Sequence, residues 1–154
     1  LVTYTPYSGA LNEYRHLYSG AKNCAAFIRE ELPSDTIFLE VNVARGSSLL
    51  PYLSEDYVFY EPHSGEPATF ATWDRAIYDR MELRGYEDIC QWARALDPDC
   101  EFVCFIITPT DGALEDGLIE AMEPYLSDDA LLYRTPDGPM ATNERYSLYA
   151  IPVA

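Results

Sequence analysis

The chain has 154 residues, of which 48% are hydrophobic and 14% aromatic, and this size and composition predict one domain around a single core. Its formal net charge of −16 repels the phosphate backbone of nucleic acids and anionic membrane surfaces, so we expect no nucleic-acid partner. The sequence has no apolar run of about 18 residues, which predicts that none of it spans a bilayer.

The first half of the chain predicts a lead-in followed by helices and two strands. Residues 1–18 are aromatic and irregular and form the lead-in. Apolar residues at helical spacing predict a helix over 21–32, and a β-rich run predicts the first strand over 36–43. A Gly-Ser-Ser turn opens a short helix over 46–53, and an aromatic run predicts the second strand over 56–61.

The second half alternates helices and strands and then ends in strands alone. Residues 62–85 form the least regular part, with a short strand and a helical turn or two. An apolar stripe predicts a helix over 86–96, and the most apolar run of the chain predicts a buried strand over 100–108. Residues 109–126 predict an acidic helix, and residues 130–153 predict two strands around a turn-rich connection.

This order of elements predicts the fold class. Alternating helices and strands indicate an α/β protein with a three-layer, Rossmann-like arrangement and a mainly parallel sheet. The last two strands are expected to form a C-terminal antiparallel hairpin. We interpret residues 1–154 as a single domain, and because residue 1 is Leu, we expect a processed chain or a domain excised from a longer one.

The turn after the first predicted strand is the first candidate for a ligand site. A helix that begins after a parallel strand binds anions through its free amides, so Arg45, Gly46, Ser47 and Ser48 could hold a phosphate or another anion. The second and third glycines of a dinucleotide-binding loop are missing, and the lysine of a P-loop is missing as well. An ordinary strand-to-helix turn is therefore the competing interpretation.

Two further turns carry polar residues at predicted strand ends. Asp111 follows the apolar strand and is either a ligand-binding carboxylate or an N-cap of the next helix. The loop after the second predicted strand contains Glu61, His63, Glu66 and Asp74, which could bind a divalent cation or act as acid and base. Their spacing matches no known ligand pattern, so we predict no metal site.

Nucleophilic catalysis and a zinc site are both disfavoured. The chain lacks the G-x-S-x-G motif of a serine nucleophile, and it has no C-x-x-C pair. Cys24, Cys90, Cys100 and Cys104 all lie in predicted core stripes, which favours buried thiols, although a single disulfide from Cys90 to the following strand is possible in an oxidising compartment. We therefore predict no catalytic residue and no cofactor.

Three stretches of the chain resemble a known family. These are "PYSGA…YSGAKNCAAFIREELPSDTIFLEVN", "LLPYLSEDYVFYEP" and the closing "NERYSLYAIPV". Their element order and aromatic placement are similar to the soluble C-terminal domain of bacterial multi-pass membrane glycosyltransferases of the mannosyl- and arabinosyl-transfer type. The resemblance spans most of the chain but contains no catalytic signature.

The resemblance implies a non-catalytic accessory domain at the extracytoplasmic face of the cell membrane. Such a domain would cover or support the membrane-embedded active site of its parent protein and touch a glycan or a lipid-linked sugar. Two alternatives from other classes stay open. One is a free-standing Rossmann-like enzyme of the nucleotide or S-adenosylmethionine class, and the other is a protein-interaction module that uses the aromatic ends of the chain.

Overall fold

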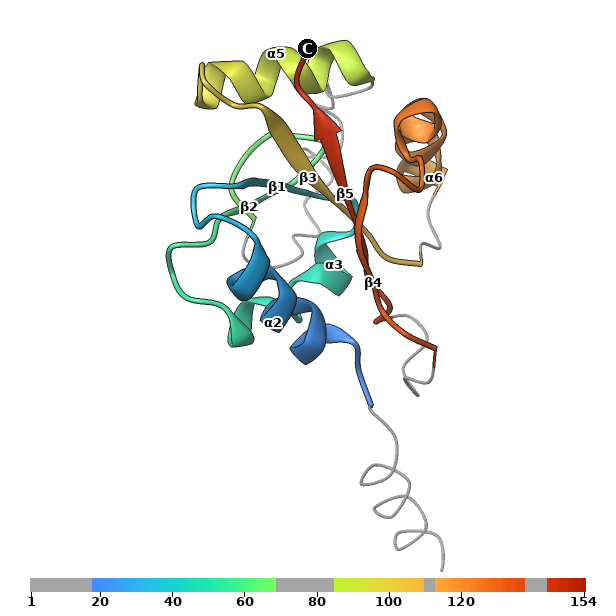
Figure 1. Cartoon of the computed structure of the whole chain (residues 1–154). Coiled ribbons are helices and arrows are strands. Elements are labelled where there is room, and N and C mark those ends of the chain that lie inside the picture. The colour runs from blue at the N-terminus through green and yellow to red at the C-terminus, as the bar shows by residue number, and fades with distance from the viewer. Residues whose placement is uncertain (1–17, 69–84, 110–112, 138–143) are drawn as a thin grey trace, which may run out of the picture.

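The fold is α/β and is built on a five-stranded open sheet with strand order β2-β1-β3-β5-β4 (Figure 1). The structure is a computed structural model that describes residues 18–68, 85–109, 113–137 and 144–154. The strands are β1 (Ile37–Glu40), β2 (Phe59–Tyr60), β3 (Phe102–Ile107), β4 (Leu131–Arg134) and β5 (Ser147–Pro152).

The sheet is parallel at one end and antiparallel at the other. β1 pairs in parallel with both β2 and β3, and Glu40 lies opposite Ile106 in this register. β5 runs antiparallel to β3 and to β4. The predicted α/β class and the predicted C-terminal antiparallel pair are confirmed, and the sheet is mixed.

Helices lie on both faces of this sheet. The helical elements are α2 (Ala21–Glu31), α3 (Val43–Gly46), η1 (Leu50–Tyr52), α5 (Tyr86–Leu96), α6 (Ala113–Met122) and η2 (Glu123–Tyr125). The inner side of α2 packs with Phe38 and Cys104 on one face. Ile89 of α5 and Leu118 of α6 pack with Leu39 and Phe105 on the other.

The central strands form because their sequences are apolar on both faces. Val103 through Ile106 of β3 are all buried, as a strand with helices above and below requires. All four residues of β1 are buried too, and the last of them is the charged residue Glu40. The core therefore surrounds β1 and β3, and one ionisable group lies at its border.

One predicted element is placed differently in the structure. Gly46 was expected to open a short helix, but α3 begins at Val43 and ends at Gly46, so the predicted start is wrong. The 3-10 helix η1 (Leu50–Tyr52) lies within the predicted range of 46–53. The helical turn forms directly after Asn42, whose carbonyl accepts the first intrahelical hydrogen bonds. The strand and helix expected within residues 69–84 and the lead-in over 1–17 lie outside the described residues.

Within the described ranges, no helix is both long and apolar enough to cross a bilayer.

Candidate functional site

The candidate site is the edge of the sheet where the parallel strands end. β2, the next strand along the chain, pairs with one side of β1, and β3 pairs with its other side. The strand order therefore reverses direction at β1. In α/β proteins ligands bind in the crevice beyond the carboxyl ends of the strands at such a point. We call this border the carboxyl edge. Its described strand ends are Glu40, Tyr60 and Ile107.

Glu40 is buried at this edge, with 1% of its surface exposed. Gly46 of α3 lies directly over its carboxyl group, and a Cβ built on Gly46 would come within 1.6 Å of Oε1. Position 46 therefore has to be glycine as long as the carboxyl group occupies this space. Oε1 itself has no hydrogen-bond partner in the part of the chain that the structure describes.

The environment of Glu40 favours its neutral form. Burial raises the pKa of this carboxyl group from 4.5 to about 8, because the charged form loses its hydration. The backbone amide of Gly46 lowers the pKa by a smaller amount. At neutral pH the folded protein therefore holds a proton on Glu40.

Tyr146 closes the same edge from the segment before β5. Its side chain is fully buried, and its hydroxyl lies 2.5 Å from Ser48 Oγ and donates to the carbonyl of Arg45 at 3.2 Å. Ser48 Oγ donates to the same carbonyl at 2.6 Å. Burial raises the pKa of Tyr146 above its usual range, the hydrogen bond with Ser48 offsets part of this, and the nearby acid Glu144 adds to it. The phenol is therefore a neutral structural group.

The backbone amides of the predicted anion site already have partners. The amides of Arg45 and Gly46 donate to the carbonyl of Asn42 at 2.9 and 3.0 Å. The amide of Ser47 donates to Val43 at 3.1 Å, and that of Ser48 donates to Arg45 at 3.3 Å. An anion at this turn would compete with these bonds and would lie beside a carboxyl group.

The end of β3 contributes Thr108 to the carboxyl edge. This residue is 1% exposed, and its Oγ1 has no hydrogen-bond partner among the described residues. It directly follows Ile107, the last residue of β3. Asp111, the other predicted site residue of this junction, lies outside the described residues.

The loop after β2 forms a tight turn in which the predicted acid–base residues have structural partners. Glu61 Oε2 accepts a hydrogen bond from Ser64 Oγ at 2.6 Å, and the amide of Gly65 donates to the carbonyl of Glu61 at 2.8 Å. Gly65 has a φ of 68°, which favours glycine, and its carbonyl accepts a bond from Trp92 Nε1 at 3.2 Å. Within the described ranges, no group of three metal-ligating side chains forms.

The other members of that predicted group differ in exposure. His63 is buried, with 8% of its surface exposed, whereas Glu66 is exposed, and Asp74 lies outside the described residues.

All four cysteines are free thiols, and three of them, Cys24, Cys90 and Cys104, are buried. Cys24 and Cys104 belong to the cluster between α2 and the sheet, and burial raises the pKa of both thiols far above the usual range. Burial also raises the pKa of Cys100, which is partly exposed. Because the thiolate is the nucleophile, these shifts disfavour a catalytic role for Cys24, Cys100 and Cys104.

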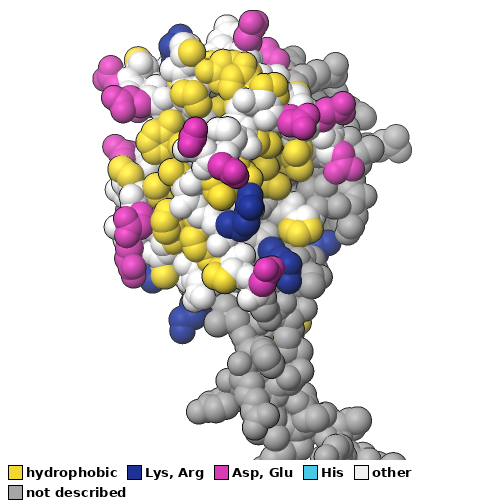
Figure 2. Space-filling view, turned by 45° about the vertical axis from the view of Figure 1, so that its right-hand side comes forward, with side chains coloured by type: hydrophobic (Ala, Val, Ile, Leu, Met, Phe, Trp, Pro, Cys, Tyr) yellow, Lys and Arg dark blue, Asp and Glu magenta, His cyan; other side chains and the backbone are white. Residues whose placement is uncertain are grey.

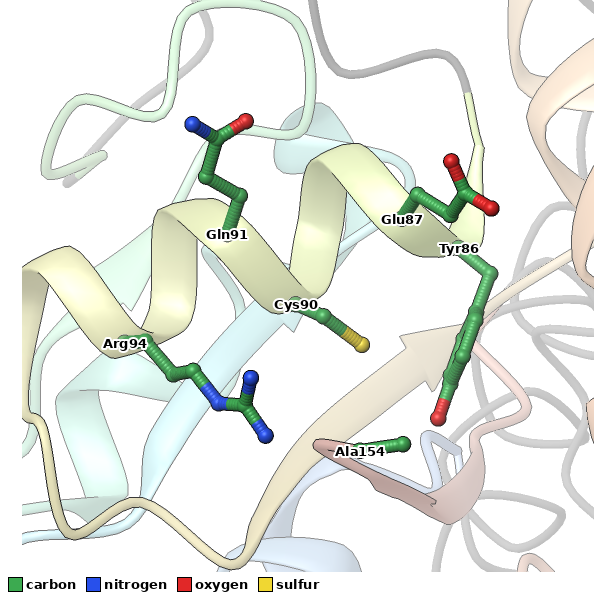
Figure 3. A pocket seen from close by; sticks show the side chains of 6 residues that line it. All are labelled: Tyr86, Glu87, Cys90, Gln91, Arg94 and Ala154. Carbon is green, nitrogen blue, oxygen red and sulfur yellow. The ribbon is translucent and has the colours of Figure 1, made fainter.

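A hollow lies at the end of the strands opposite the carboxyl edge, beside α5 (Figure 3). It has a volume of about 430 Å³ and is open to solvent. Tyr86 stacks on Tyr125 at a ring distance of 3.9 Å, and its hydroxyl donates to the carbonyl of Pro152 at 2.8 Å. The lining residues are Tyr86, Glu87, Cys90, Gln91, Arg94 and Ala154.

Comparisons with known proteins do not identify the chain. No protein-family model matches it, and no curated protein or solved structure shows significant similarity to it.

Sequence reasoning missed Glu40 and Tyr146, the two residues that define the carboxyl edge. Glu40 carried a usable signal, because a carboxylate at the end of a short apolar strand is uncommon inside a core. Gly46, six positions later, adds to this signal because only a residue without a side chain fits over the carboxyl group. Tyr146 carried none, since its partner Ser48 is 98 positions away along the chain.

Proposed function

We propose that the chain is a non-catalytic accessory domain of a larger membrane protein, of the glycosyltransferase type that its sequence resembles. In this proposal the domain lies on the extracytoplasmic face of the cell membrane and covers or supports the active site of its parent. Its partners are then the parent membrane domain and, through it, a glycan or a lipid-linked sugar.

One observation carries the non-catalytic part of this proposal. At the described carboxyl edge, the backbone amides and the two hydroxyls that a Rossmann-like enzyme would offer to an anion are used within the chain itself. The amides of residues 45–48 donate to backbone carbonyls, and the hydroxyls of Ser48 and Tyr146 bond to the same turn. A buried carboxyl group fills the space beneath Gly46. This arrangement supports a structural edge over a preformed nucleotide site.

The surface gives weaker support for docking onto another protein. Figure 2 shows apolar side chains spread across the visible face, with acidic side chains mostly around its margin. Several large apolar residues are well exposed, which is compatible with contacts to a partner. They are Tyr18 at 58%, Leu96 at 45%, Tyr52 at 44% and Val58 at 39%.

The proposal includes the three-layer, Rossmann-like arrangement of the domain. Its support is the packing of α2 on one face of the sheet and of α5 and α6 on the other, together with the parallel order of β2, β1 and β3. The antiparallel pair β4 and β5 is an addition to that parallel unit.

A second candidate is a free-standing Rossmann-like enzyme of the nucleotide or S-adenosylmethionine class. The observation that favours it is the pKa of Glu40, because strongly shifted carboxyl groups at strand ends are typical of active sites. In that case Glu40 would act as the acid or base, and the edge would have to open to admit substrate. A protein-interaction module remains the third reading and shares the exposed apolar residues with the first.

Cell fractionation tests the first proposal. An antibody against this domain is used to follow the natural gene product in its own cells, and intact cells are treated with a protease. We expect the product in the carbonate-washed membrane fraction, with the domain cleaved from outside. A product found only in the soluble fraction would contradict the proposal.

A thermal-shift screen with nucleotides and S-adenosylmethionine distinguishes the enzyme candidate from a non-catalytic accessory domain. A ligand at one hundred times its Kd stabilises a protein by about 2.7 kcal/mol, which is easily measured. We expect no shift at millimolar ligand, and a clear shift would favour the enzyme.

A further inference from the structure

The ionisable side chain of Glu40 is buried in the core directly beneath α3, a helix of only four residues. We propose that Glu40, Gly46 and Tyr146 form a pH-sensitive latch, which holds α3 closed over the carboxyl edge while Glu40 is neutral and loosens it as Glu40 ionises. The latch is a property of this edge alone and does not depend on the proposed function.

The first support is the difference in anchoring on the two sides of the carboxyl group. β1 is hydrogen-bonded to a strand on each side, so it cannot shift alone. α3 has only the four residues Val43–Gly46, and short helices depend on tertiary contacts for their stability. The turn above Glu40 is therefore the element that yields when the carboxyl group requires water.

The second support is the contact between the turn and Tyr146, which reaches it from the segment before β5. Tyr146 bonds to Ser48 Oγ and to the carbonyl of Arg45, and both contacts lie within the turn that follows Asn42. If the turn lifts, these contacts break together, and the fully buried Leu49 and Tyr146 gain access to solvent. The opening of the latch thus exposes apolar and phenolic surface at the carboxyl edge.

The third support is the charge around the carboxyl group. Tyr146 interacts with Glu40, and Glu144 and Cys24 act in turn on Tyr146. Arg45 of α3 has an interaction of its own, and it is not among the causes that shift the pKa of Glu40, which are burial and the amide of Gly46. Oε1 also lacks a hydrogen-bond partner among the described residues. An ionised Glu40 in the closed turn is therefore unfavourable, and opening relieves it.

The sign of the effect follows from proton linkage. The closed form holds the proton of Glu40 up to a pH of about 8, whereas an open, hydrated carboxyl group loses it near 4.5. Between these values each pH unit favours opening about tenfold, and above the upper value the effect levels off. The latch is tightest below about pH 4.5 and weakest above about pH 8.

Amide hydrogen exchange on the full 154-residue chain tests the latch. The rates of amides 43–49 are measured from pH 5 to pH 8 and divided by the intrinsic rate at each pH. We expect protection to fall about tenfold per pH unit, and small additions of urea to leave it unchanged, as for local opening. Protection that is independent of pH, or that shares the urea dependence of β3, would overturn the proposal.

Two variants assign the effect to the carboxyl group. Glu40→Gln keeps the shape but cannot ionise, so we expect constant protection of amides 43–49 over the same pH range. Glu61→Gln is the matched control, because Glu61 lies at the same edge with a hydroxyl partner. In this variant we expect the protection of amides 43–49 to fall with pH as steeply as in the wild type. A slope that persists in Glu40→Gln would contradict the latch, and if that variant fails to fold, the wild-type urea and pH series still decides.

Discussion

Two tyrosines at opposite ends of the strands differ in the burial of their hydroxyl groups. At the carboxyl edge the hydroxyl of Tyr146 is buried and bonds to Ser48 and Arg45 beneath α3. At the other end the hydroxyl of Tyr86 lies at the surface beside an open hollow and bonds to Pro152. A typical position for a ligand site is thus filled by the chain itself, while the hollow that is open was not expected from the sequence.

This contrast teaches that topology alone does not make a binding site. The strand order reverses at β1, which is where α/β proteins bind ligands, yet the amides of the turn after β1 and the hydroxyls of Ser48 and Tyr146 bond within the chain. The unusual feature of the edge is instead a buried acid, Glu40. The following predictions test whether changes at the buried edge alter the free energy of unfolding more than changes at the exposed hollow.

We expect the largest effect from pH. Because the folded protein holds the proton of Glu40 up to a pH of about 8 and the unfolded chain only to about 4.5, this stabilisation is complete below pH 4.5 and is lost as the pH rises to 8. The loss is about 1.4 kcal/mol per pH unit. Urea unfolding of the wild type and of Glu40→Gln from pH 5 to pH 8 measures this loss. It is the difference between the two proteins in the slope of the free energy of unfolding against pH. Parallel slopes would show that Glu40 is not the source.

The second largest effect is expected for Gly46→Ala. The new methyl group would overlap Oε1 of Glu40, so we predict a loss of about 1–3 kcal/mol in the free energy of unfolding. Gly117→Ala in α6 is the matched control, because its Cβ meets no atom within 4 Å, and we expect it to be stabilising by about 0.5–1 kcal/mol. Equal effects of the two changes would contradict the close packing of Gly46 on Glu40.

A smaller effect is expected for Tyr146→Phe. The change removes a buried hydroxyl that bonds to Ser48 and to the carbonyl of Arg45. We predict a loss of about 1–2 kcal/mol in the free energy of unfolding, measured in urea. Tyr18→Phe, at a site that is 58% exposed, should leave the stability unchanged.

The smallest effect is expected for Tyr86→Phe, which is the same chemical change at the other end of the strands. Its hydroxyl is at the surface, where water replaces the lost bond to Pro152, so we predict a loss of at most about 0.5 kcal/mol. The ratio between the two tyrosine variants measures the contrast directly. A cost as large as that of Tyr146→Phe would remove the distinction between the buried edge and the exposed hollow.

Much of the fold was predictable because it is encoded by local patterns. The helical spacing of 21–32 and 86–96 and the unbroken apolar run of β3 identify α2, α5 and the central strand. The terminal antiparallel pair follows from two β-rich runs that have no helix between them. These signals lie within single segments, so no tertiary information was needed.

The site was less predictable because its contacts are distant along the chain. The sequence predicts a ligand turn at Gly46 and a helix that begins there, whereas in the structure α3 ends at Gly46 and this glycine makes room for the carboxyl group of Glu40. The partners of Ser48 and Arg45 come from Tyr146, about one hundred positions away. Spacing along a sequence does not report such pairs, and the burial that shifts the pKa of Glu40 exists only in the folded chain.

The central claim is that the closed carboxyl edge keeps Glu40 protonated at neutral pH. Its most direct test is an NMR titration of the side-chain carboxyl carbon of Glu40 in the folded chain, assigned by comparison with Glu40→Gln. The account predicts a midpoint near pH 8. A midpoint near 4.5, the ordinary value for a glutamate, would contradict it, because the carboxyl group would then be hydrated and the edge open.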